Sequence, residues 1–252
     1  MKAFILFFIL CSYPWQILLA NENVQENEEP LIKIRLGLEV TPGLLQVDGD
    51  GLIDRALREI ESKSPIRFKR TYLSYTRAKI EMEKGNLDLI GLTPHRHETK
   101  SFYKYARELD WNFSTNLILL CSSEKALDLK KGELIGTLSG NEEFISEIAG
   151  VDIESFREGS LESILLRVKK KRIPCVSFEE ISTLKIAMSL KMDGLYFRKL
   201  GEVRGSFAIM NKKGSDKLKK TLEDVFNKVD WDNYLKGVKR LPEGKRKGKV
   251  TF

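Results

Sequence analysis

The chain has 252 residues, of which 42% are hydrophobic and 31% are charged, and its formal net charge is +7. This length is enough for one large domain or for two lobes with their own hydrophobic cores. Most of the basic residues alternate with acidic ones, which is typical of solvated faces and argues against nucleic acid as a partner. The positive charge still favours small anionic solutes, because it raises their concentration near the surface.

The first twenty residues have the layout of a secretory signal peptide. Lys2 precedes an apolar stretch from Ala3 to Leu10, and the small residue Ala20 stands before a polar, acidic segment. No later segment stays apolar for the roughly 18 residues that a membrane-spanning helix needs. We therefore expect residues 1–20 to be removed and the mature protein to be exported to the periplasm. A retained N-terminal anchor is the alternative.

From Leu31 onwards, strand and helix patterns alternate. Alternating or compact apolar runs predict strands, and apolar residues at helical spacing predict helices. In the first half, these patterns predict strands at residues 33–40, 66–72 and 87–92, helices at residues 51–63 and 75–85, and a short helix directly after Thr93.

The same alternation restarts in the second half of the chain. It predicts strands at residues 116–123, 133–138 and 173–178, helices at 141–149, 160–172 and 179–190, and a last strand and helix at 206–211 and 217–229. Such alternation predicts an α/β protein in which mostly parallel sheets are flanked by helices. Two such units with a final return suggest two lobes, and ligands of open α/β sheets bind beyond the carboxyl ends of the strands.

The order and spacing of several segments resemble a known family. The region from about Leu31 to about Leu241 resembles the family 3 extracellular solute-binding proteins, the amino-acid-binding components of ABC importers. The resemblance rests on IRLGLEV, DGDGLIDRALREI, YTRAKIEMEKGNLDLIGLTPHR, LKKGELIGTLSGNEE, RIPCVSFEE and FAIMNKKGSDKLKKTLEDVFNKV. It implies a two-lobed periplasmic-binding-protein fold of type II with hinge crossovers near residues 110–116 and 201–205. The implied parts are residues 31–113 and 203–241 for lobe 1, residues 114–202 for lobe 2, and a basic, disordered tail at residues 242–252.

Arg96 is the first candidate for a ligand contact. In the family, an arginine in a T-x-x-R pattern after the third strand binds the ligand's α-carboxylate, and Thr93 and Arg96 match that pattern. The planar guanidinium fork fits a carboxylate through two parallel hydrogen bonds. Thr93 followed by Pro94 also reads as a helix N-cap with proline at the first helical position, whose backbone N–H groups would face the anion. A capped surface turn with Arg96 in a salt bridge is the alternative.

The resemblance also implies an aromatic site, and here the chain departs from the family. Tyr75 stands where the family places a ring over the ligand, although it could equally pack within the lobe. Leu44 or its neighbour replaces the second ring, and Gly91 stands where the family often has Ser or Thr. Arg77 could offer a second cation to the cleft, or lie on a solvated helix face.

Lobe 2 should supply the remaining contacts. Asn141 stands at the start of a helix after a glycine-spaced loop, where the family has a Ser or Thr that contacts the carboxylate, but Glu142 and Glu143 already satisfy the helix dipole. The family's acid that pairs with the ligand's ammonium group corresponds to Glu179, with Glu180 as the adjacent possibility. A helix-capping acid is the alternative role for this residue.

Other chemistry has little support in the sequence. His95 and His97 point to different sides of a helix at that spacing and have no further partner for a metal ion. There is no nucleophile-elbow motif and no phosphate-binding loop. We therefore expect no cofactor, no metal and no catalytic residue. Cys121 and Cys175 could form a disulfide after export or remain buried thiols.

Three functions remain open from the sequence. The first is a monomeric solute-binding protein that captures a small carboxylate-bearing, amino-acid-like ligand and delivers it to a membrane ABC permease. The second is an enzyme on the same scaffold, dehydratase-like, with Glu179 as general acid. The third is a sensory binding protein that signals to a membrane receptor. Fold alone does not separate them.

Overall fold

The computed structural model describes residues 30–252 except residues 153 and 159. The predicted signal peptide at residues 1–20 lies outside this part of the chain. Across the described residues, no helix has both the length and the apolar composition needed to cross a membrane. The described strands form a ten-stranded mixed sheet. Its main order is β2 (Ile66–Tyr72), β1 (Ile32–Leu38), β3 (Leu89–Pro94), β9 (Tyr196–Met210), β5 (Phe113–Cys121), β8 (Cys175–Glu179), β6 (Leu134–Leu138) and β7 (Glu154–Glu158), while β4 (Ala106–Glu108) and β10 (Lys247–Lys249) pair with β9. The mixed α/β architecture agrees with the sequence-based prediction.

The first half of the chain builds a parallel three-stranded unit. Strands β1 (Ile32–Leu38), β2 (Ile66–Tyr72) and β3 (Leu89–Pro94) pair in parallel, and helices α1 (Leu52–Lys63) and α2 (Tyr75–Glu83) connect them. The apolar residues that predicted α1 are all buried: Ile53, Ala56, Leu57 and Ile60. They share one hydrophobic cluster with the buried side chains of β1.

The helix predicted directly after Thr93 does not form. Strand β3 continues through Thr93 and Pro94, because both residues pair with β9, opposite Ser206 and Gly205. The next helix is the four-residue α3 (Phe102–Tyr105), followed by β4 (Ala106–Glu108). The prediction of an N-cap at Thr93 was therefore wrong, since pairing with a strand distant in sequence overrode the local signal.

The second half builds its own unit. Strand β6 (Leu134–Leu138) pairs in parallel with β8 (Cys175–Glu179) and with β7 (Glu154–Glu158). The sequence patterns had predicted β6 and β8 but no strand at the position of β7. Helices α4 (Glu142–Ala149), α5 (Leu161–Lys169) and α6 (Glu180–Ser189) match the predicted positions. Two further hydrophobic clusters lie here, one of them centred on buried side chains of α5, β8 and α6.

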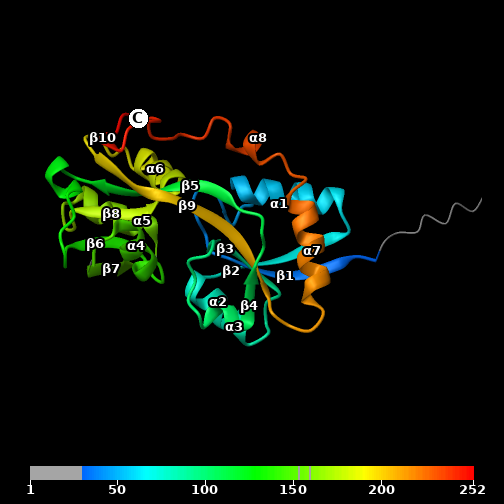
Figure 1. Ribbon diagram of the computed structural model, residues 1–252. Helices are drawn as coiled ribbons and strands as arrows, with labels where there is room; N and C mark the ends of the chain where they lie inside the picture. The colour runs from blue at the N-terminus through cyan, green and yellow to red at the C-terminus, as the bar shows by residue number, and fades with distance from the viewer. Residues whose placement is uncertain (1–29, 153, 159) are drawn as a thin grey trace, which may run out of the picture. The chain divides into compact units, whose positions relative to one another are not determined.

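Strand β9 (Tyr196–Met210) connects the two units (Figure 1). Its last residues pair antiparallel with β3, and residues 196–205 pair antiparallel with β5 (Phe113–Cys121). Both predicted crossovers thus fall on or next to this long strand pair. In the register of β5 and β9, Phe113 lies opposite Gly205.

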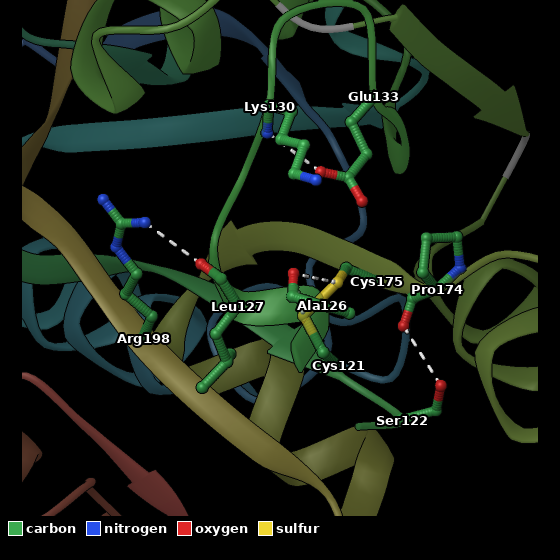
Figure 2. Close-up of a disulfide and its surroundings, with 9 residues drawn as sticks. All are labelled: Cys121, Ser122, Ala126, Leu127, Lys130, Glu133, Pro174, Cys175 and Arg198. Atoms are coloured by element: carbon green, nitrogen blue, oxygen red, sulfur yellow. Dashed lines mark hydrogen bonds between the residues drawn. A yellow bond between two sulfur atoms is a disulfide. The ribbon is translucent and has the colours of Figure 1, made fainter. Parts of the chain in front are cut away.

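A disulfide joins Cys121 to Cys175 (Figure 2). The two residues lie directly opposite each other in the antiparallel pair of β5 and β8, with Cα atoms 4.1 Å apart. Both are buried, and the carbonyl oxygen of Ala126, in the 3₁₀ helix η1 (Glu124–Leu127), lies 3.5 and 3.3 Å from the two sulfur atoms. Of the two states that the sequence left open, the structure has the bridge.

The C-terminal tail contradicts the expectation of disorder. After α7 (Ser215–Phe226) and α8 (Trp231–Leu235), the chain ends in β10 (Lys247–Lys249), which pairs antiparallel with the start of β9. Leu241 and Val250 are buried. The basic composition of residues 242–252 concealed the burial of Val250 and the strand pairing of β10.

Candidate ligand-binding pocket

A pocket is lined by residues of β3, β5, β8 and β9, by the segment after β1, and by helices α2 and α4. Its volume is about 710 Å³, including the part open to solvent. Residues from both halves of the chain line it. They are Glu39, Thr41, Leu44, Tyr75, Leu92, Thr93, Pro94, Phe113, Thr115, Leu117, Asn141, Phe144, Ile145, Phe178, Glu179, Val203, Arg204 and Gly205.

Aromatic and aliphatic side chains make up most of the wall. Three phenylalanines, Phe113, Phe144 and Phe178, come from β5, α4 and β8, and Tyr75 begins α2. The Tyr75 side chain is buried, and its hydroxyl donates a hydrogen bond of 2.5 Å to Oε1 of Glu98. Burial and the neighbouring Glu98 carboxylate raise the pKa of Tyr75 well above its usual value. Tyr75 is therefore a neutral ring whose hydroxyl is already used.

Leu44 lies in the wall because a short loop holds it there. The backbone of Thr41 and Leu45 forms an isolated bridge, and the N–H of Gln46 donates to the buried carboxylate of Asp54 at 2.6 Å. Leu44 is buried in the first hydrophobic cluster. Leu44 thus contributes an aliphatic side chain to the pocket wall.

Two carboxylates face the pocket from opposite halves of the chain. Glu39 follows β1, and its Oε1 accepts a hydrogen bond of 3.1 Å from the backbone N–H of Tyr75. Burial raises the pKa of Glu39, and that hydrogen bond offsets part of the effect. Within the described residues, no Lys, Arg or His forms an ion pair with Glu39, although an isolated charge at a partly buried site is costly.

Glu179 is the second carboxylate, and it caps a helix. It is the N-cap of α6, where its oxygens accept from the N–H of Ile181 at 2.8 Å and of Ser182 at 2.6 Å. The hydroxyl of Thr115 donates to Glu179 at 3.5 Å. Burial raises the pKa of Glu179, while these backbone hydrogen bonds and the charge of Arg240 lower it. The helix-capping alternative from the sequence is therefore real, and Glu179 lines the pocket as well.

Arg204 is the cation in the pocket wall. It lies on β9 opposite Ser114, and its exposed guanidinium is 3.5 Å from Oε1 of Glu202. Arg96, the predicted anion receptor, does not line the pocket. Its backbone has a φ of 65°, its N–H donates to Oε2 of Glu108 at 2.9 Å, and its side chain is exposed. Arg77 is also outside the pocket, because it pairs with Glu81 on the exposed face of α2.

The other predicted residues have local roles in the structure. Thr93 is buried in the wall, and its hydroxyl donates to the carbonyl of Ser206 at 3.2 Å. Asn141 occupies the N-cap position of α4, but its side chain caps nothing and donates to the carbonyl of Leu138. Of the seven predicted residues, five thus line the pocket: Leu44, Tyr75, Thr93, Asn141 and Glu179.

Gly91 departs from the family pattern for a steric reason. It lies opposite Phe207 in the pair of β3 and β9, and a Cβ atom at residue 91 would overlap the Phe207 ring. The ring that fills this space belongs to the first hydrophobic cluster. A hydroxyl from Ser or Thr is therefore absent because the core of this chain needs that volume.

Sequence reasoning missed several lining residues, among them Glu39, Thr115, Phe144 and Arg204. Glu39 had a usable signal, since it stands at the carboxyl end of a predicted strand, and ligands of α/β sheets bind beyond such ends. Phe144 had no such signal, because its position depends on a contact with a segment distant in sequence. Its ring lies 5.4 Å from the ring of His97, which follows β3.

No metal site accompanies the pocket. Among the described residues, no group of three or more His, Cys, Asp or Glu side chains is arranged to hold a metal ion.

The comparisons with known proteins bear on the fold. No family model and no curated protein matches the sequence. Solved structures do match. The GluR0 ligand-binding core in complex with L-glutamate is 12% identical, with a TM-score of 0.65 over 80% of this chain and 94% of that one. A putative L-cystine ABC transporter protein from Listeria monocytogenes is 17% identical, with a TM-score of 0.64 over 82% and 93%.

A mutant of the arginine-binding protein ArgBP from T. maritima is 14% identical, with a TM-score of 0.63 over 82% of this chain and 94% of that one. At these identities the likeness concerns the fold. The chain therefore has the two-lobed α/β fold that these binding proteins share, as its resemblance to the family implied.

Proposed function

We propose that the protein is an exported, monomeric solute-binding protein that captures a small amino-acid-like ligand in this pocket and delivers it to a membrane ABC permease. The main support is the pocket itself, which combines a largely apolar wall with a carboxylate, Glu39, that has no cation partner among the described residues. A ligand ammonium group would supply that cation. The fold shared with amino-acid-binding proteins supports the same reading.

The charges of the pocket suit a zwitterion. In this proposal Glu39 pairs with the ammonium group, and Arg204, which also lines the pocket, receives the carboxylate through its planar fork. The aromatic wall of Phe113, Phe144 and Phe178 packs the apolar part of the ligand. Arg96, predicted from the T-x-x-R pattern, is the competing receptor for the carboxylate and would have to turn inward to reach it.

The enzyme alternative is less well supported. A general acid needs a proton to give and a free path to the substrate. Burial does raise the pKa of Glu179, but both of its oxygens already accept hydrogen bonds from the start of α6. We therefore assign Glu179 a structural role at the pocket wall. Transport and sensing would both use this pocket. The two functions differ in the membrane protein that binds the chain, an ABC permease for transport or a receptor for sensing.

A thermal-shift screen over L-amino acids, their decarboxylated amines and their deaminated keto acids tests the proposal. A ligand that binds the native state raises its stability by RT ln(1 + [L]/Kd). We expect a shift with amino acids that have apolar side chains, and its loss in Glu39→Gln and Arg204→Ala. If Arg96→Ala removes the shift and Arg204→Ala does not, Arg96 is the receptor. If no compound class shifts the melting temperature, or if the protein converts one of the compounds chemically, the binding proposal is wrong.

A further inference from the structure

The chain returns to the second half of the fold after α8. We define residues 231–250 as the strap. Its first anchor is in the hydrophobic cluster of the first half, where the Trp231 ring lies 4.3 Å from that of Trp111. The indole N–H of Trp231 donates to the carbonyl of Phe226 at 2.8 Å. The hydroxyl of Tyr234 donates to Oε2 of Glu59 in α1 at 2.5 Å.

The second anchor of the strap is in the second half. Leu241 is buried in the cluster that contains the apolar side chains of α5 and α6, together with Val250. Strand β10 pairs with residues 196–198 of β9, and the N–H of Val250 donates to the carbonyl of Leu195 at 2.8 Å. The strap therefore adds its own strand to the sheet, beside the first residues of β9.

The link between the anchors is short. Five residues, 236–240, separate the end of α8 from Leu241, and five residues span at most about 18 Å when fully extended. The paired strands β5 and β9 already join the two halves. The strap is a third covalent connection, and its length limits how far the halves can separate.

The second anchor also contacts residues of the pocket. The carboxylate of Glu180 is fully buried and accepts hydrogen bonds from the side-chain amide of Asn116 and from the backbone N–H of Leu241. Arg240 lies 3.7 Å from the same carboxylate and donates to the hydroxyl of Thr115 at 3.3 Å. A buried carboxylate needs such partners. Thr115 in turn donates to Glu179, so Arg240 is two contacts away from the pocket's second carboxylate.

We propose that the strap is a third crossover that restricts the opening of the two halves, and that Arg240 is a positioning residue that holds Thr115 and the Glu179–Glu180 corner in the pocket wall. The part that concerns the pocket rests on the proposed function. The restraint on opening does not, and the experiments below need no ligand. Their failure is therefore distinguishable from a failure of the ligand screen.

Cutting the strap in the folded protein tests the restraint without impairing folding. A protease site is introduced by substitution next to Gly237, which is exposed, so that the strap keeps its length. Spin labels are attached through an unnatural amino acid at the exposed positions 69 and 170 of the full chain. We expect the distance distribution between the labels to broaden towards longer distances after cleavage. The matched control carries the same site after Gly244, which leaves both Tyr234 and Leu241 joined; cleavage there should change nothing. An unchanged distribution after the cut at Gly237 would overturn the restraint.

The role of Arg240 is tested through Glu179. The charge of Arg240 lowers the pKa of Glu179, so Arg240→Gln should raise that pKa in a ¹³C NMR titration of the glutamate carboxyl groups. Arg240→Lys keeps the positive charge and should bring the pKa of Glu179 back close to its wild-type value. Lys239→Gln is the control, since Lys239 is exposed and makes none of these contacts. If Arg240 only stabilised the fold, a variant with an unchanged melting temperature would show the same pKa of Glu179 as the wild type. Equal Glu179 titrations in Arg240→Gln and Lys239→Gln would reject the positioning role.

Discussion

Breaking the bridge between Cys121 and Cys175 should destabilise the protein strongly. The bridge closes a loop of 54 residues in sequence, and the chain-entropy relation for a loop of this length gives about 4 kcal/mol at 25 °C. For a folded region of about 220 residues, that loss corresponds to a fall in melting temperature of about 10 °C. The loss is expected because the unfolded chain regains the conformations that the bridge forbids.

The bridge also bears on the pocket. It fixes one end of the β5 and β8 pair, and at the other end of the same pair Leu117 lies opposite Glu179. Without the bridge, these strands keep their hydrogen bonds, so we expect the pocket to persist in the folded state. The effect should therefore appear in the free energy of unfolding far more than in ligand affinity.

Urea unfolding measures this prediction directly. Because both sulfur atoms are buried, the protein is reduced in urea and refolded in the presence of reductant. Its urea unfolding, with reductant still present, is then compared with that of the oxidised protein at the same pH and salt concentration. The variant with Cys121→Ala and Cys175→Ala controls for effects of reductant elsewhere and should not respond to it. A difference of less than about 1 kcal/mol between the oxidised and reduced proteins would refute the loop-closure reasoning.

Three further predictions concern single side chains. Gly91→Ala should lower the free energy of unfolding in urea by about 1–3 kcal/mol, because the added methyl group would overlap the Phe207 ring. Adding Phe207→Leu to the same chain should recover part of that loss, and an equal loss in the single and the double variant would contradict this reasoning. Asp88 is held by Arg35 at 2.8 Å and by Lys212, which keeps its pKa far below the ordinary 3.8, so it adds stability above pH 3.8 that is lost as the pH falls towards the folded-state pKa. Asp88→Asn should flatten this acid limb of a stability–pH curve, and an unchanged limb would count against the ion pair. Burial raises the pKa of Glu39 above the ordinary 4.5, so the unliganded fold loses stability as the pH rises through that raised value, and affinity for an ammonium-bearing ligand is lost as the pH falls through it; in Glu39→Gln calorimetry should find neither dependence.

The sequence predicted much of the secondary structure because its signals were local and periodic. Ile53, Ala56, Leu57 and Ile60 recur at helical spacing, and all are buried in α1. The resemblance to the solute-binding family implied Tyr75, Leu44 and Glu179 as contact positions, and all three line the pocket. The periodic pattern alone locates the strands and helices that carry them, but not their role in a pocket.

Other features depend on contacts between distant segments. Thr93 and Pro94 have the local signature of a helix start, but pairing with Ser206 and Gly205 keeps them in β3, and this places Arg96 outside the pocket. The basic tail conceals Val250, whose burial depends on a core built much earlier in the chain. Local composition carries no information about either partner.

The central claim is that the pocket between the two halves holds a small cationic or zwitterionic solute at Glu39. Native mass spectrometry of the gently purified full chain, with Glu39→Gln prepared in parallel, tests it most directly. We predict a bound small molecule at one per chain in the wild type, released on denaturation, carrying an amine and absent from the variant. A co-purified molecule without an amine, or one retained equally by Glu39→Gln, would contradict the account.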